Sequence, residues 1–137
     1  MHRPLPARIG AERCGGAPVM DVRIEATATA VLVIAEGRLD FGAAAAFQKH
    51  LERALAGAGD AAARVLVDCA GLEYVSSAGL RVFLLGAKTA QRAGVAFALC
   101  ALRPPVREVV ELSGFGRIIA VYPDRAAALA GTRGSPP

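Results

Sequence analysis

Residues 72–81, Leu-Glu-Tyr-Val-Ser-Ser-Ala-Gly-Leu-Arg, mark the point at which an apolar strand gives way to a helix. Two adjacent serines, Ser76 and Ser77, open that helix. A hydroxyl at this position can cap the first turn by accepting hydrogen bonds from backbone N–H groups that lack a partner inside the helix. The positive end of the helix dipole also favours a phosphate there. The serine pair therefore predicts a helix cap, a phosphorylation switch, or both.

Hydrophobic periodicity on both sides of this segment alternates between strand and helix. The order of the expected elements is ββαβαβαβα, which predicts an α/β fold with a mixed, mostly parallel sheet and helices packed on it. The serine pair lies at the C-terminal edge of that sheet, where functional groups of such folds gather. Before the serine pair, we expect a hairpin over 22–35 that turns near Thr29, a helix over 42–56 ended by Gly57 and Gly59, and a strand over 64–69 followed by a loop through Tyr74. A helix then runs from the serine pair to Gly94. After it we expect a strand over 95–100, a helix over 104–112, a strand over 117–122 and a helix over 123–130.

The length of 137 residues fits one domain. Residues 1–20 are rich in Pro, Gly, Ala and Arg and show no periodicity, so we expect a disordered N-terminal extension. The folded domain is predicted over 21–130, and a disordered C-terminal tail over 131–137. Because regular patterning begins just after Met20, this methionine is a candidate translation start alongside Met1.

The formal net charge of +4 comes mainly from the two ends of the chain, because acidic and basic residues nearly balance over 21–130. A nucleic-acid-binding domain is expected to carry a basic face with stacking aromatic side chains, and this chain has no Trp and few aromatic residues. No apolar run reaches the roughly 18 residues of a membrane span, and no signal peptide is recognisable. We therefore expect a cytoplasmic protein with no membrane span that does not bind nucleic acid.

Three cysteines, Cys14, Cys69 and Cys100, show no C-x-x-C or Cys/His ligand spacing. Their odd number and their spacing argue against a disulfide framework and against a zinc site. Cys69 and Cys100 are expected to be buried strand residues. Cys14, which is followed by two glycines, is expected to be an exposed free thiol. No metal or cofactor is expected.

The residues that enzymes use are not grouped in this sequence. His2 lies in the N-terminal segment, and His50 lies on an alanine-rich helix where we expect it to be exposed or half-exposed. Asp40 and Asp68 end strands and are expected to be turn or cap carboxylates. Residues 113–116, Ser-Gly-Phe-Gly, follow a helix rather than a strand, which favours a helix C-cap over a phosphate-binding loop. We expect no catalytic residue and no enzyme activity.

Four segments of the chain resemble the anti-sigma factor antagonists built on the STAS domain, and the resemblance covers roughly residues 21–130. Each segment matches a strand end, a helix start or a turn of that family. The resemblance implies a single STAS domain that acts by binding and not by catalysis. The segments are Gly37-Arg38-Leu39-Asp40, Val65-Leu66-Val67-Asp68, Val75-Ser76-Ser77-Ala78-Gly79-Leu80 and Leu112-Ser113-Gly114-Phe115.

In that bacterial family, the serine that follows an Asp at the helix start is phosphorylated by the anti-sigma factor, which is itself a serine kinase. The resemblance implies that Ser77 is the acceptor. Ser76 stands where the family has Asp, and it can cap the helix or act as an alternative acceptor. The implied function is a partner switch in transcription regulation, with an anti-sigma factor serine kinase and a PP2C-type phosphatase as partners. The implied partner-binding residues are Asp40, Ser76, Ser77, Ala78, Gly79 and Arg81.

Two other functions fit the same residues. The first is a STAS-like binding subunit of a lipid or solute transporter complex, in which the serines only cap the helix. The second is a small enzyme of flavodoxin-like appearance, which is less favoured because no base or ligand set accompanies the serines. Phosphate transfer to Ser77 separates the partner switch from the transporter subunit, and a tightly bound metabolite or metal would support the enzyme.

Overall fold

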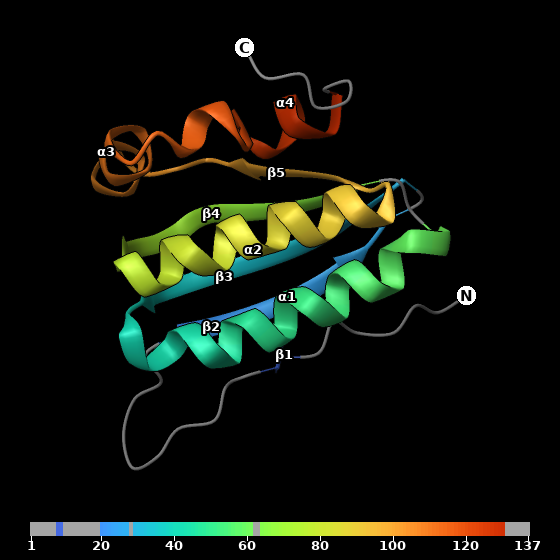
Figure 1. The fold of residues 1–137 in the computed structure, drawn as a ribbon, viewed down its shortest axis with the longest axis horizontal. Coiled ribbons are helices and arrows are strands. Elements are labelled where there is room, and N and C mark those ends of the chain that lie inside the picture. The colour runs from blue at the N-terminus through green and yellow to red at the C-terminus, as the bar shows by residue number, and fades with distance from the viewer. Residues whose placement is uncertain (1–7, 10–19, 28, 62–63, 131–137) are drawn as a thin grey trace.

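A single mixed sheet forms the centre of the computed structural model, which describes residues 8–9, 20–27, 29–61 and 64–130 (Figure 1). Its six described strands follow one another in chain order across the sheet. The two pairings at the N-terminal side are antiparallel, and the three pairings from β3 to β6 are parallel, as the strand and helix order predicts. The strands are β1 (Arg8–Ile9), β2 (Met20–Ala26), β3 (Ala30–Leu39), β4 (Arg64–Val75), β5 (Ala96–Cys100) and β6 (Ala120–Tyr122).

The helices cover the two faces of the sheet unequally. α1 (Phe41–Ala61) and α2 (Ser77–Ala93) lie side by side on one face, as Figure 1 shows. α3 (Pro104–Leu112) contributes Val106 and Val110 to the same apolar core, and the 3-10 turn η1 (Phe115–Arg117) follows it. α4 (Arg125–Ala130) lies on the opposite face against β5 and β6.

The larger core lies between the sheet and the helices α1 and α2. Phe47 and Phe83 meet there edge to face, with ring centroids 5.7 Å apart and an angle of 88° between the rings. This arrangement is the one that aromatic quadrupoles favour, and it joins the two helices. A smaller cluster on the other face contains Leu32, Ile34 and Leu66. The core is therefore aliphatic with few aromatic rings, in keeping with the composition.

Helix α1 is longer than expected. The prediction that Gly57 and Gly59 end the helix is wrong, because α1 continues to Ala61. Glycine inside a helix costs roughly 0.5–1 kcal/mol relative to alanine, which a buried neighbour can offset. Ala58 is fully buried in the main core cluster. Packing of this last part of α1 therefore outweighs the weak helix propensity of the glycines.

Strand β4 also differs from the expectation. Residues 70–74, which were expected to form a loop, continue the strand to Val75. They pair with the end of β3 in a register that shifts twice, between Ile34 and Glu36 and between Gly37 and Arg38. These irregularities let β3 and β4 run on together until Leu39 lies opposite Val75. The two strands therefore reach the helix starts as neighbours.

Two smaller differences concern the last strand and the N-terminal segment. The last strand begins at Ala120 rather than Arg117, because the chain first forms η1 after Gly114 adopts a left-handed conformation, with φ of 81°. Arg8–Ile9, within the segment expected to be disordered, form a short strand that pairs with β2. The other residues of 1–19, Cys14 among them, and the tail over 131–137 lie outside the described residues. No helix within the described part is long and apolar enough to cross a membrane.

Candidate functional site

Ser76 caps helix α2 and attaches its start to the end of β3. Its backbone is extended, with φ of −90° and ψ of 174°, and its Oγ accepts a hydrogen bond of 3.1 Å from the backbone N–H of Gly79. The same hydroxyl donates a hydrogen bond of 3.2 Å to the carbonyl oxygen of Leu39, and the Ser76 N–H donates one of 2.9 Å to the same oxygen. The Ser76 hydroxyl is therefore occupied as both donor and acceptor.

Ser77 is in a different environment. It is the first residue of α2 and is exposed, and its hydroxyl has no hydrogen-bond partner among the described residues. The first turn of α2 contains no acidic residue that would repel an added phosphate. The helix dipole also favours negative charge at this end. The two serines therefore differ: Ser76 caps the helix with a hydrogen-bonded hydroxyl, and Ser77 presents an exposed hydroxyl that has no partner among the described residues.

Gly79 lets the first turn of α2 lie directly on the strand ends. A Cβ atom at this position would come within 2.7 Å of Leu39 Cγ and 2.9 Å of Val75 Cγ2. Carbon atoms do not approach so closely without a shift of their surroundings. Gly79 is itself buried, so it acts through this close packing and not as a surface contact.

Asp40 lies beside the serine pair and caps the neighbouring helix. Its Oδ1 accepts a hydrogen bond of 2.9 Å from the backbone N–H of Ala43, in the first turn of α1. This confirms the expectation of a cap carboxylate. Asp40, Ser76 and Ser77 all follow the last paired residues of β3 and β4, so the fold brings them to one end of the sheet. Arg81 is exposed one turn further along α2.

Two aromatic residues at this end of the sheet were not among the predicted site residues. Phe41, the first residue of α1, is 82% exposed. Tyr74 is also exposed, and the guanidinium carbon of Arg38 lies 4.4 Å from the centre of its ring, as in a cation–π contact. Phe41 could have been noticed in the sequence, because it falls outside the apolar stripe formed by Phe47 and its helical neighbours.

Asp68 has a structural role on the opposite face of the sheet. The residue is only 7% exposed, and its carboxylate accepts hydrogen bonds from the backbone N–H of Ala70 and from the guanidinium of Arg125. The Arg125 side chain comes from α4, so the pair attaches that helix to β4. The prediction that Asp68 ends a strand as a turn or cap carboxylate is wrong, because β4 continues past it to Val75. Its partner Arg125 on α4 was not foreseen.

Cys69 and Cys100 are buried free thiols, as predicted. Burial, together with the neighbouring thiol and carboxylate, raises the pKa of Cys69 well above its ordinary value. Burial first, and then the Asp68 carboxylate, raises the pKa of Cys100 from 9.0 to about 12. Both side chains are therefore neutral and shielded near neutral pH.

His50 is buried, at 8% exposure, so the prediction of an exposed or half-exposed histidine is wrong. The reason is helical spacing, because His50 lies three residues after Phe47 and next to Leu51 on the side of α1 that faces the core. His50 therefore belongs to the packed face of α1 and not to the surface around the serine pair. Among the residues that the structure describes, no group of three His, Cys, Asp or Glu side chains could hold a metal ion.

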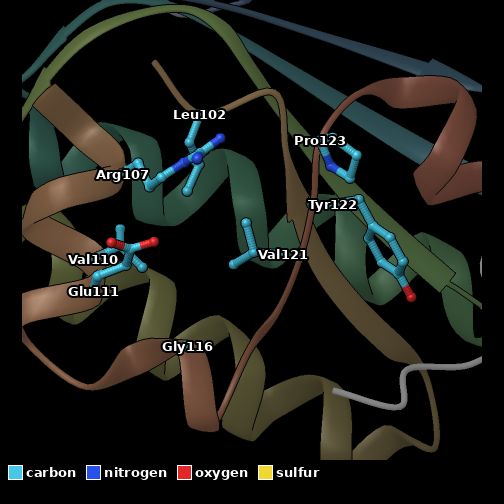
Figure 2. A pocket seen from close by; sticks show the side chains of 8 residues that line it. All are labelled: Leu102, Arg107, Val110, Glu111, Gly116, Val121, Tyr122 and Pro123. Carbon is cyan, nitrogen blue, oxygen red and sulfur yellow. The ribbon is translucent and has the colours of Figure 1, made fainter. Parts of the chain in front are cut away.

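A pocket of about 320 Å³ lies between α3, η1 and the end of β6 (Figure 2). Its polar side chains are those of Arg107, Glu111 and Tyr122, and neither serine of the pair lines it. Figure 2 shows Val121 at the centre of its wall and Pro123 beside Tyr122. The pocket is open to the surface and is separate from the helix start at Ser77. Its lining is completed by Leu102, Val110 and Gly116.

Comparison with known proteins supports the resemblance noted in the sequence. Residues 21–128 match the model of the STAS domain family. BtrV of Bordetella bronchiseptica, named as a candidate anti-sigma factor antagonist, is 51% identical to this chain over 67 residues. The matched segment covers 49% of this chain and 58% of BtrV, so it spans little more than half of that relative.

Solved structures share the fold at low sequence identity. An anti-sigma factor antagonist from Mycobacterium paratuberculosis superposes with a TM-score of 0.74 at 21% identity, over 84% of this chain and 95% of that one. The Bacillus protein SpoIIAA, in its phosphorylated form, gives a TM-score of 0.61 at 19% identity, over 82% of this chain and 99% of that one. These similarities show that the arrangement of strands and helices is the same.

Proposed function

This chain belongs to the STAS domain family, and from that premise we propose that it is an anti-sigma factor antagonist controlled by phosphorylation of Ser77. It binds a kinase-type anti-sigma factor in the cytoplasm and is released when that partner phosphorylates it. The observation that carries the proposal is the exposed Ser77 hydroxyl, which has no hydrogen-bond partner among the described residues and stands at the start of α2. The similarity to BtrV supports the same function.

The switch works through a local change of charge. Phosphorylation adds about −1.5 to −2 charges near neutral pH. Within the protein, the positive end of α2 partly compensates this charge, so the fold is retained. Across an interface, the phosphate loses water and faces the partner, which costs several kcal/mol, and each ~1.4 kcal/mol lowers affinity tenfold. Release therefore needs no large rearrangement.

Ser76 takes the capping role and leaves Ser77 as the acceptor. Phosphorylation of Ser76 would remove the hydrogen bond that its hydroxyl donates to Leu39 and would disturb the bond that it accepts from Gly79. Ser77 can be modified without the loss of either bond. The neutral serine at position 76, where the resemblance places the family's aspartate, thus supplies the helix cap in this chain.

Phosphate transfer tests this function directly. The full chain is incubated with ATP and the kinase-type anti-sigma factor encoded closest to its gene, and the modified residue is located by mass spectrometry. We expect phosphate on Ser77 in the unchanged protein and in Ser76→Ala, and none in Ser77→Ala. A PP2C-type phosphatase should then remove it. Phosphate on Ser76 in place of Ser77 would contradict the assignment of the acceptor. Absence of transfer together with association with a transporter would favour the transporter subunit.

A further inference from the structure

Phe41 lies at the same end of the sheet as the proposed phosphorylation site. The last register pair of β3 and β4 is Leu39 with Val75, and the first residues of α1 and α2, Phe41 and Ser77, each follow two residues later. Because the two strands are parallel neighbours and the two helices pack together, both helix starts lie at the same end of the sheet (Figure 1). A side chain at 82% exposure in this place is available to a partner.

The residues that follow Phe41 on α1 are uncharged as far as Gln48. Along α1, the exposed residues that follow it are Gly42, Ala45 and Ala46, and the first charged side chain of the helix is Lys49. The solvent-facing side of a helix usually carries charged residues. Exposed apolar groups gathered beside a functional residue are typical of protein interaction sites. The start of α1 therefore has the composition of an interface and not of a solvated helix face.

The usual size of a protein interface indicates that a partner bound at Ser77 also covers Phe41. A specific interface buries about 800 Å² on each partner, which corresponds to a patch of roughly 16 Å radius. A kinase that transfers phosphate to Ser77 must centre on that residue. Packed helices lie about 8–10 Å apart, so the start of α1 falls inside such a patch. The partner that reaches Ser77 therefore also covers Phe41.

We propose that Phe41 is an apolar anchor by which the kinase-type anti-sigma factor docks beside Ser77, an inference that rests on the proposed function. The partner offers an apolar pocket to the ring, next to its phosphate-transfer site. Aromatic side chains buried at the centre of an interface commonly carry much of the binding free energy. The cap that Asp40 provides to the Ala43 N–H fixes the start of α1 and thus the base of the Phe41 side chain.

Affinity and phosphorylation kinetics test the anchor. We expect Phe41→Ala to weaken binding to the anti-sigma factor about tenfold or more, and Phe41→Leu to recover part of the loss. The KM of Ser77 phosphorylation should rise by a similar factor, with kcat little changed, because the ring serves docking and not the transfer step. Calorimetry gives the affinity, and timed mass spectrometry of the phosphoprotein gives the rates.

Ile118→Ala is the matched control. Ile118 is 57% exposed and lies just before β6, which runs parallel to β3 and β4, so it stands at the opposite end of the sheet from Ser77. We expect this variant to bind and to be phosphorylated like the unchanged protein. Thermal unfolding of Phe41→Ala should also be unchanged, which separates docking from folding.

Three results would overturn the anchor. If Phe41→Ala binds as tightly as the unchanged protein while Ser77 is still phosphorylated, Phe41 has no role and the proposed function stands. If Phe41→Ala converts a dimer of this chain to a monomer and leaves binding to the anti-sigma factor unchanged, the ring contacts a second copy of the chain and not the kinase. If the unchanged protein neither binds nor receives phosphate, the proposed function fails, and the docking role fails with it.

Discussion

Arg125 on α4 holds the buried carboxylate of Asp68 on β4, although the two residues are 57 positions apart. The guanidinium donates hydrogen bonds of 3.0 Å from Nε and 2.7 Å from Nη2 to Oδ2. At its other end, α4 is held by Arg64, whose Nη1 donates to the carbonyl oxygens of Ala128 and Leu129. Two arginine contacts thus attach this short helix to the sheet.

Arg125→Ala should therefore destabilise the protein. It leaves the Asp68 carboxylate buried with the Ala70 N–H as its remaining partner in the described structure. We expect the free energy of unfolding to fall by about 2 kcal/mol, less than for a fully buried pair because the Arg125 side chain is 39% exposed. Urea unfolding measures the change. Arg107→Ala, which removes an exposed arginine without a described partner, should change it by less than about 0.5 kcal/mol.

Two glycines on the helices should respond in opposite ways to alanine. Gly79→Ala places a methyl group against Leu39 and Val75, and we expect a loss of about 1–3 kcal/mol. Gly57→Ala adds a methyl group where no atom lies within 4 Å, inside α1, and should gain about 0.5–1 kcal/mol. Urea unfolding of both variants checks the pair. A loss at Gly57, or no loss at Gly79, would contradict the packing described at these positions.

Ser76→Ala should cost about 1 kcal/mol, because the start of α2 loses its cap. Ser76→Asp restores an acceptor for the Gly79 N–H, but a carboxylate cannot donate to the Leu39 carbonyl oxygen. We therefore expect the stability of Ser76→Asp to lie between that of Ser76→Ala and that of the unchanged protein. Thermal unfolding ranks the three. If Ser76→Asp is the most stable, the hydrogen bond to Leu39 contributes little.

Ser77→Asp should weaken binding to the anti-sigma factor, and Ser77→Ala should bind but not be switched by ATP. The Asp carboxylate imitates part of the phosphate charge, and we expect a loss of affinity of about tenfold or more. Neither change removes a hydrogen bond of the described structure, so both variants should unfold like the unchanged protein. Calorimetric titration with the partner gives the affinities, and equal values for all three proteins would refute the charge mechanism.

The Cys100 thiol should make stability depend on pH in the alkaline range. Its pKa of about 12 in the folded protein lies above the ordinary value of 9.0, chiefly because it is buried. The neutral thiol therefore favours the folded state fully below about pH 9, and this contribution is lost as the pH rises toward 12. The urea midpoint should fall more steeply over this range in the unchanged protein than in Cys100→Ala. If the urea midpoints of the two proteins fall in parallel between pH 9 and 12, the raised pKa of Cys100 is contradicted.

Most of the fold could be predicted because its signals are local. Alternating and continuous apolar runs located the strands, and Gly94, which ends α2 in a left-handed conformation, could be identified from the sequence. The extension of α1 past Gly57 could not be predicted from the sequence, because it depends on the burial of Ala58 in the folded core. The continuation of β4 to Val75 depends on its pairing with β3. The strand propensity of residues 70–75 alone does not reveal that pairing.

The candidate site could be predicted in part. The serine pair and Asp40 have local signatures of helix starts, and the structure places them together. The division of roles between Ser76 and Ser77 depends on which residue has an extended backbone next to Leu39, and that is a tertiary contact. The pairing of Asp68 with Arg125 depends on where α4 crosses the sheet, so no spacing rule could reveal it.

The hydrogen bonds between Ser76 and the Leu39 carbonyl oxygen fix the backbone just before the proposed acceptor, Ser77. Segments that order only when a partner arrives reduce the affinity by the conformational entropy that they lose. Ser77 follows a residue that is already fixed to a buried strand end, so little of the docking free energy is spent on ordering it. Under the proposed function, we therefore expect the partner to lose little binding free energy in ordering this site, and a single phosphate on Ser77 to be enough to reverse binding.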